Sequence, residues 1–219
     1  MNKMPIENVC RLVTVALSLM AVCGCSALSP STTLPPDFYS LNSLSGASTV
    51  AVATAAPTLI IDPPHAAAGF DSARIIYLRE LHKLEYFAHS EWVDPPARML
   101  GPLLVAAIEN SGGFRAVVLA PSAAAGELRL DTEIIRLQHE FQTKPSRVRF
   151  TLRATLIDAR THRVLARREF DGSIAAASED PYGGVVAANR AVQTVLEGVS
   201  AFCAETARNL STDALGAVH

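Results

Sequence analysis

The feature that most constrains the fold is a strict alternation of apolar and polar residues over 147–156. Every second side chain from Val148 to Leu156 is apolar, whereas Arg147, Arg149 and Arg153 occupy positions between them. Because side chains in a β-strand point alternately to its two faces, this pattern predicts a strand with one buried and one solvated face. Half-buried strands of this kind are typical of antiparallel sheets.

The preceding segment, 128–141, alternates in the same way but changes phase. Apolar residues occupy even positions up to Ile134 and odd positions from Ile135 onward. One extra residue in a strand produces such a change, so the sequence predicts a β-bulge near Ile134. A turn over 143–146 then joins the two segments as an antiparallel hairpin.

This hairpin would place Asp131 and Glu133 on the same face as Arg149 and Arg153. Opposite charges on neighbouring strands form cross-strand pairs, which is the interpretation we prefer. An anion-binding site made by the outward arginines is the alternative. The role of Arg147 in either arrangement is left open.

The remaining segments complete the fold class. Further β-rich runs lie at 38–41, 58–62, 74–78, 84–88, 114–119 and 164–170. Apolar residues at helical spacing predict two helices, over 95–111 and about 184–209. The order of strands, helix, four strands and helix predicts an α+β fold, with a mixed or antiparallel sheet and two main helices packed on one face.

Two of the prolines in the first helix bear on where it starts. Asp94 is a plausible N-cap, with Pro95 at the first helical position. Pro102 removes a backbone donor, so we expect a kink there or a later helix start.

The amino terminus indicates export. Residues 12–22 form an apolar run of eleven residues with a weakly positive start before it. Such a helix is about 17 Å long, well short of the roughly 30 Å hydrocarbon core of a bilayer, so residues 1–24 are expected to be a signal peptide. The run ends in Val22-Cys23-Gly24-Cys25, which resembles the bacterial lipobox and makes Cys25 the expected lipidation site. Lipidation at Cys23 and ordinary secretion are the alternatives.

Cleavage before Cys25 defines the organisation of the mature chain. Residues 25–36, rich in Ser, Thr and Pro, are expected to be a lipidated N-terminus and flexible tether, followed by one domain over 37–210 and a tail over 211–219. The mature chain keeps one other cysteine, Cys203, on the apolar stripe of the second helix, where we expect a buried and inert thiol.

Charge and motif content exclude several functions. With 19 Lys and Arg against 21 Asp and Glu, and no long basic run, the chain lacks the positive surface that nucleic acid binding needs. His65, His82, His89 and His162 do not have metal-ligand spacing. No catalytic motif is found, so we predict a non-enzymatic protein with no catalytic or metal residues and no cofactor beyond a covalent lipid on Cys25.

Aromatic residues are concentrated between Tyr77 and Trp92. Large amphipathic rings suit protein interfaces, so Tyr77, Tyr86 and Trp92 are the candidate partner-binding residues. The alternative, favoured for Phe87 and Trp92, is that the rings bury against the first helix.

Several motifs together resemble a known family. They are Phe38-Tyr39-Ser40-Leu41, Ile76-Tyr77, Leu84-Glu85-Tyr86-Phe87-Ala88, Trp92-Val93-Asp94-Pro95-Pro96-Ala97-Arg98-Met99-Leu100 and Ser111-Gly112-Gly113-Phe114. In this order they resemble the ABC-type transport auxiliary lipoproteins, the group that includes paraquat-inducible protein C, over about residues 25–208. Pro102 and the pair Gly183-Gly184 depart from the pattern expected at helix starts.

The resemblance implies a fold like the amino-terminal domain of the periplasmic protein TolB. It also implies a non-catalytic role beside an ABC permease and ATPase, through docking on a substrate-binding subunit with an MCE domain. Such systems move phospholipid or other apolar molecules between the inner and outer membranes. Ser26 after the lipidated cysteine favours the periplasmic face of the outer membrane.

Two other functions stay open at this point. The chain could be a stand-alone carrier of lipid or another apolar ligand, or a structural envelope lipoprotein that acts on β-barrel partners. The residues indicate neither the cargo, nor the direction of transport, nor whether the chain forms a homo-oligomer.

Overall fold

The computed structural model describes residues 35–42 and 56–216, with side chains up to Leu210. The chain divides into two compact units, 1–35 and 36–219, and the fold below is that of the second. The expected signal peptide and Cys25 lie outside the described residues.

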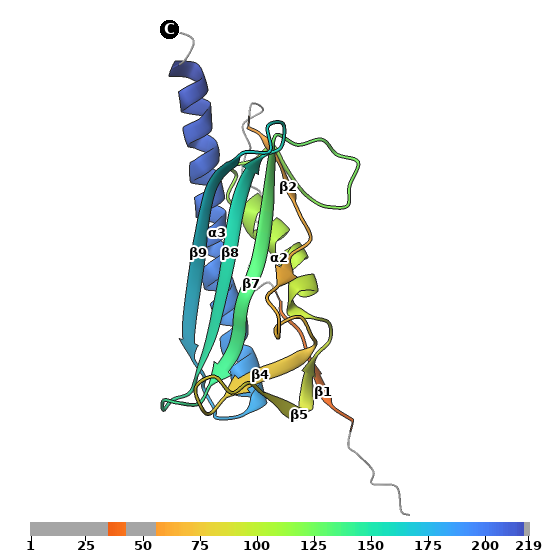
Figure 1. The fold of residues 1–219 in the computed structure, drawn as a ribbon, viewed down its shortest axis with the longest axis vertical. Coiled ribbons are helices and arrows are strands. Elements are labelled where there is room, and N and C mark those ends of the chain that lie inside the picture. Colours follow the sequence, from red (N-terminus) through yellow and green to blue (C-terminus); the bar gives the residue numbers. More distant parts are fainter. Residues whose placement is uncertain (1–34, 43–55, 217–219) are drawn as a thin grey trace, which may run out of the picture. The chain divides into compact units, whose positions relative to one another are not determined.

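A mixed sheet of nine strands is organised around one long strand, β7 (Leu128–Glu140). On one edge β7 pairs antiparallel with β8 (Arg147–Asp158), and β8 pairs antiparallel with β9 (Val164–Ala175) (Figure 1). The register of β7 on β8 shifts between Ile134 and Arg136, which confirms the predicted bulge.

Three shorter strands follow one another along the opposite edge of β7, all parallel to it. They are β2 (Thr58–Ile61), β3 (His65–Ala66) and β4 (Arg74–Leu78). The two-residue strand β3 was missed by the sequence analysis, because so short a segment carries no alternation. The sheet is therefore mixed rather than purely antiparallel.

The remaining strands extend this edge. β5 (Glu85–Trp92) pairs antiparallel with β4, as predicted, and β1 (Asp37–Tyr39) pairs parallel with β5. β6 (Ala116–Leu119) pairs parallel with β2.

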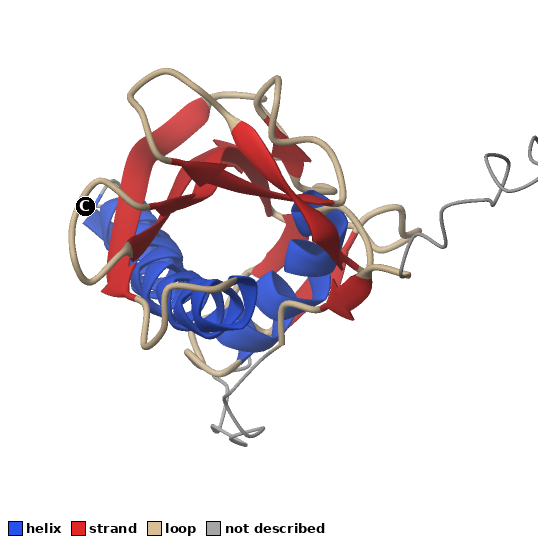
Figure 2. Ribbon diagram, turned by 90° about the horizontal axis from the view of Figure 1, so that it is seen from below, coloured by secondary structure: helices blue, strands red, loops and turns tan. Residues whose placement is uncertain are grey.

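Two helices, α2 (Pro96–Glu109) and α3 (Pro181–Gly216), lie together on one side of the curved sheet, as Figure 2 shows. Buried side chains of both helices belong to one hydrophobic core with the inward face of β7 and β8, which confirms the predicted fold class. The fully buried large side chains include Leu100, Leu104, Ile108, Leu130, Ile134, Phe150, Leu152, Leu156, Val192 and Val199.

The predicted start of α2 is wrong by one residue. Pro95, not Asp94, occupies the N-cap position, with a ψ of 134° and no side-chain hydrogen bond to the helix. Pro95 is itself followed by Pro96, and a residue before proline is disfavoured in helical conformation, so the helix begins at Pro96. It then continues through Pro102, so the later start that we considered does not occur.

The helix α3 begins earlier and ends later than predicted. Asp180 Oδ1 accepts a hydrogen bond of 2.7 Å from the Gly183 backbone N–H, and Pro181 follows as the first helical residue. This is an N-cap with proline at the next position, which the sequence analysis overlooked. At the other end the helix runs to Gly216, since extending an existing helix is far easier than starting one.

Cys203 lies in the core between α3 and the sheet, as predicted. Burial raises the pKa of its thiol to about 12. The thiol therefore stays protonated and unreactive at physiological pH.

Ion pairs cover the outward face of the long strands. Arg153 lies between two carboxylates, Glu133 at 2.5 Å and Glu169 at 2.6 Å, which confirms one predicted pair and adds a second. These hydrogen bonds raise the pKa of Arg153, with Glu169 the larger contributor.

The other two residues of this predicted face, Asp131 and Arg149, do not pair with each other. Arg149 contacts Asp171 at 3.1 Å, whereas Asp131 faces His65 at 3.5 Å. The register places Asp131 opposite Thr155, six positions along β8 from Arg149. β9 continues beyond its predicted end at 170 and brings Asp171 alongside Arg149. Arg147 donates hydrogen bonds to the Ser173 hydroxyl and carbonyl, so each of the three outward arginines has a partner within the sheet.

Candidate functional site

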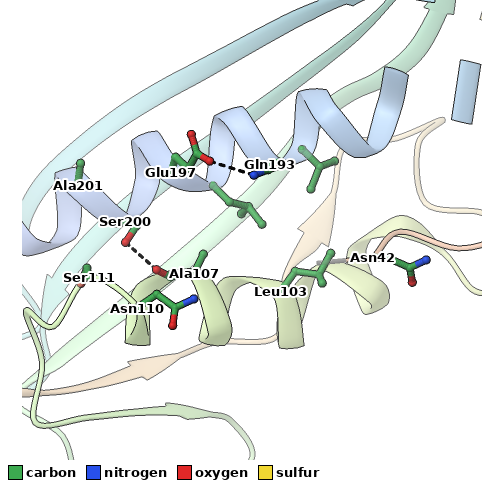
Figure 3. A pocket seen from close by; sticks show the side chains of 11 residues that line it. Asn42, Leu103, Ala107, Asn110, Ser111, Gln193, Glu197, Ser200 and Ala201 are labelled. Atoms are coloured by element: carbon green, nitrogen blue, oxygen red, sulfur yellow. Dashed lines mark hydrogen bonds between the residues drawn. The ribbon is translucent and has the colours of Figure 1, made fainter. Parts of the chain in front are cut away.

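A groove of about 330 Å³ lies between α2 and α3. We call it the interhelical groove, and Figure 3 shows its side chains. Its lining consists of Asn42, Leu103, Ala107, Asn110, Ser111, Val192, Gln193, Leu196, Glu197, Ser200 and Ala201.

The floor of the groove is made by residues four positions apart on facing helices. Leu103 and Ala107 project from α2, and Val192 and Leu196 from α3. Residues at this spacing lie one above another on a helix, so each helix presents a short apolar ridge. Ser200 donates a 2.9 Å hydrogen bond to the Ala107 carbonyl and holds the two helices together at one end of the groove.

Asn189 holds the chain after β1 against α3, near the opposite end of the groove. Its side-chain oxygen accepts a 2.7 Å hydrogen bond from the Asn42 backbone N–H, and its amide donates to the Ser40 carbonyl at 3.2 Å. These two bonds are made by one amide that also bonds Val185 within the helix. The Asn42 end of the groove is therefore positioned by a defined contact.

The rim of the groove is polar but nearly uncharged. Gln193 donates to Glu197 at 3.2 Å, and the lining contains no Lys, Arg or His. A phosphate group would find no cation there. Leucine and valine in the floor suit an apolar side chain or a hydrocarbon chain. The amides and hydroxyls at the rim can form hydrogen bonds with polar groups next to that chain.

None of the three candidate partner-binding residues from the sequence lines this groove. Trp92 is only 4% exposed and belongs to the hydrophobic core, so its ring is not accessible to a partner in this conformation. Trp92 is buried, and it lines a small cavity together with Leu137 of β7 and Val185 and Ala188 of α3, the second helix.

The two tyrosines point to opposite faces of the β4–β5 hairpin. Tyr77 lies opposite Glu85 and Tyr86 lies opposite Ile76, and paired residues share a face while neighbours alternate. The Tyr77 ring packs on Phe87 at 4.5 Å between ring centres, whereas Tyr86 is 39% exposed with the Arg74 guanidinium over its ring. The structure therefore does not bring these residues into one patch, and their role in partner binding stays a prediction.

A buried histidine, His139, lies near the end of β7 and was not among the residues predicted from the sequence. The Nε2 atom of His139 lies 2.8 Å from the Ser146 hydroxyl, and the Glu179 carboxylate accepts a 2.8 Å hydrogen bond from the Ser146 backbone N–H. Burial lowers the pKa of His139, although Glu179 and Asp180 act in the opposite direction. Because both His139 and Ser146 are buried, no substrate can reach this set in the conformation described.

Within the described ranges, no group of His, Cys, Asp and Glu residues has the arrangement of a metal site. The helices described there also include none that is long and apolar enough to cross a membrane.

Comparison with known proteins identifies the family of the chain. Residues 39–200 match the family model described as "ABC-type transport auxiliary lipoprotein component". The chain belongs to this family. The family is one of auxiliary transport lipoproteins, which places the protein at a membrane on the periplasmic side and beside an ABC transporter.

Solved structures support the fold of this auxiliary lipoprotein. Protein XCC0632 from Xanthomonas campestris is 22% identical, with a TM-score of 0.69 over 80% of this chain and 99% of that one. A second structure, of an uncharacterized protein, is 11% identical, with a TM-score of 0.61 over 78% of this chain and 99% of that one. No curated protein matches the chain.

Proposed function

We propose that this auxiliary lipoprotein is held by a lipid on Cys25 at the periplasmic face of the outer membrane and docks on the MCE-domain subunit of an ABC system. The system would carry lipids or other apolar substrates between the two membranes. The protein's part is to tether and position that subunit, with no catalytic step of its own. Family membership supports the transporter association, and the expected lipobox supports the anchor.

The observation that carries the docking proposal is the chemistry of the interhelical groove. Its floor is apolar, its rim is uncharged except for Glu197, and it lies between helices fixed by the Ser200 hydrogen bond. A preformed apolar cleft with a polar rim is how protein interfaces accept an inserted hydrophobic side chain. We therefore assign the groove to an apolar segment of the MCE-domain subunit.

Site-specific photocrosslinking in the intact lipidated chain tests this assignment. A photoreactive residue at Gln193, on the groove rim, is expected to capture the MCE-domain subunit in cells, and one at Val164 is not. Val164 is the control because it is 59% exposed and lies on β9, away from the groove. Equal capture at both positions, or capture at Val164 alone, contradicts docking through the groove.

The docking proposal as a whole has its own test. The tagged full-length protein is isolated from crosslinked membranes, and the proteins that accompany it are identified by mass spectrometry. Recovery of an MCE-domain protein with its permease and ATPase is expected. Their absence would remove the docking proposal, whatever the groove binds.

The groove also favours a second candidate function, that of a lipid carrier. A volume near 330 Å³ lies within the range of roughly 300–1,000 Å³ found for small-molecule sites. If a hydrocarbon chain occupies the groove, lipid should co-purify with the protein in the absence of any partner, and Leu103→Gln should reduce its amount. Docking alone predicts that the same variant loses the MCE-domain subunit and that no lipid is found with either form.

A further inference from the structure

The turn between β4 and β5 presents two leucines to solvent. Leu81 is 73% exposed and Leu84 is 39% exposed, in a turn that spans residues 79–84. Single exposed apolar residues are common, but two exposed leucines in the turn of one hairpin form a small apolar patch. We call this turn the hairpin tip.

The hairpin tip is held in shape by its own contacts. At its base the Arg79 guanidinium forms two hydrogen bonds with the Glu85 carboxylate, at 2.5 and 2.9 Å. Further out the Lys83 backbone N–H donates to the Glu80 carbonyl at 3.3 Å, and the Lys83 ammonium lies 3.7 Å from the Glu80 carboxylate. The leucines are therefore presented on an ordered turn.

These contacts also balance the charge of the hairpin tip. Arg79 is matched by Glu85 and Lys83 by Glu80, so no net charge from these four groups surrounds the leucines at neutral pH. A layer of anionic headgroups would not repel such a tip. Long arginine and lysine side chains can keep their charged ends in the headgroup layer while their stems lie among apolar groups.

The strand registers place the hairpin tip at one end of the sheet. Leu78, just before the tip, pairs with Glu140 at the carboxyl end of β7. Val164 lies at the opposite end, because its partner Ile157 pairs with Arg129 near the start of β7. Figure 1 shows the β4–β5 hairpin and the start of β9 at these two ends.

β1 runs in the direction that leads away from the hairpin tip, beside the last three residues of β5. β1 runs parallel to β5, with Asp37 beside Ser90 and Tyr39 beside Trp92. Since β5 starts at the tip, the first residue of β1 faces the tip end. Asp37 follows Cys25 by twelve positions, a reach of at most about 40 Å at roughly 3.3 Å per residue.

We propose that the hairpin tip is a second membrane contact, in which Leu81 and Leu84 enter the interfacial layer of the bilayer that holds the Cys25 lipid. The inference rests on the lipid anchor of the proposed function. Two leucines bind a bilayer weakly by themselves, but the anchor makes their insertion intramolecular and so raises their effective concentration at the surface. The domain then has a fixed orientation on the membrane.

Fluorescence from the full-length lipidated protein in vesicles tests the proposal. The vesicles contain phosphatidylethanolamine and phosphatidylglycerol, and an environment-sensitive dye is attached through Leu81→Cys or, as the matched control, Val164→Cys. Both sites are exposed and apolar, and Cys203 is buried, so the dye reports the chosen site. We expect a blue shift, and quenching by brominated lipid, at position 81 and neither at position 164.

Three results would overturn the proposal in distinguishable ways. If the protein floats with the vesicles but position 81 reports the same aqueous environment as position 164, the tip does not insert. If the protein does not float at all, the lipid anchor itself is refuted and the tip proposal falls with it. If the blue shift at position 81 occurs only after a purified MCE-domain protein is added, the tip is a protein contact and not a membrane contact.

Discussion

The first turn of α3 packs so closely on the His139 ring that only glycine fits at position 184. A Cβ atom on Gly184 would lie 2.5 Å from His139 Nδ1 and 3.0 Å from Cε1. The ring has little room to move. Its other nitrogen, Nε2, contacts the Ser146 hydroxyl, and the centre of the imidazole ring lies 4.1 Å from the centre of the Phe141 ring. Gly184→Ala therefore forces a shift in a buried ring or in the helix start.

The expected loss follows from two opposing effects. Overpacking of a core typically costs about 1–3 kcal/mol, whereas replacing glycine by alanine within a helix contributes about 0.5–1 kcal/mol of stability. The net prediction for Gly184→Ala is a loss of about 1–2 kcal/mol in the free energy of unfolding. Gly198→Ala is the control, because its Cβ would approach only the Phe170 side chain, at 3.0 Å, and the helix gain should about cancel the cost.

Urea unfolding of the two variants and the wild type, followed by circular dichroism, measures the difference. A gain in stability for Gly184→Ala would refute the packing argument, since helix propensity would then be the dominant effect. A second measurement isolates the contact. In a His139→Ala background the ring is gone, so Gly184→Ala should no longer destabilise, and the double-mutant cycle should show a coupling of at least about 1 kcal/mol.

Two further predictions concern the core and its pH dependence. Leu104→Ala removes a fully buried side chain from α2 and should lower the unfolding free energy by about 2–5 kcal/mol in the same urea assay, whereas Leu81→Ala at the exposed tip should change it by less than about 0.5 kcal/mol. His139 has a pKa below its usual value of about 6.5 because it is buried, so the unfolded chain binds the extra proton first and stability falls as pH drops through about 6.5 toward the lower folded pKa. Thermal unfolding between about pH 7 and 5 should show this loss in the wild type and in the exposed control His89→Gln, and a smaller slope in His139→Gln; equal slopes in all three would contradict it.

The long strands were predictable because their information is local. Alternation from Val148 to Leu156 defines both the strand and its buried face, and the phase change at Ile134 locates the bulge without reference to any other part of the chain. The buried stripe of α3 follows from helical spacing in the same way, and Cys203 falls on it.

Features that depend on distant segments were not predictable. Asp171 pairs with Arg149 because β9 runs longer than its own alternation indicates. The Gly183-Gly184 pair departs from a typical helix start. Gly183 lies close against Ser178, but the reason for Gly184 lies in His139, 45 positions earlier by residue number. The interhelical groove likewise arises where α2 and α3 approach each other, which neither helix reveals alone.

The groove and the hairpin tip together set the height above the bilayer at which a partner would meet the domain. Gly184 lies against His139, and His139 pairs with Tyr77 near the tip, so the start of α3 is at the tip end of the domain. The groove residues of α3 run from Val192 to Ala201, about 12 to 26 Å further along the helix at about 1.5 Å per residue. With the tip on the bilayer, the groove therefore stands at a height set by the helix and not by the tether. A partner docked in the groove would meet the domain at that height however long residues 25–36 are, which gives the rigid hairpin a function that the lipid anchor by itself does not supply.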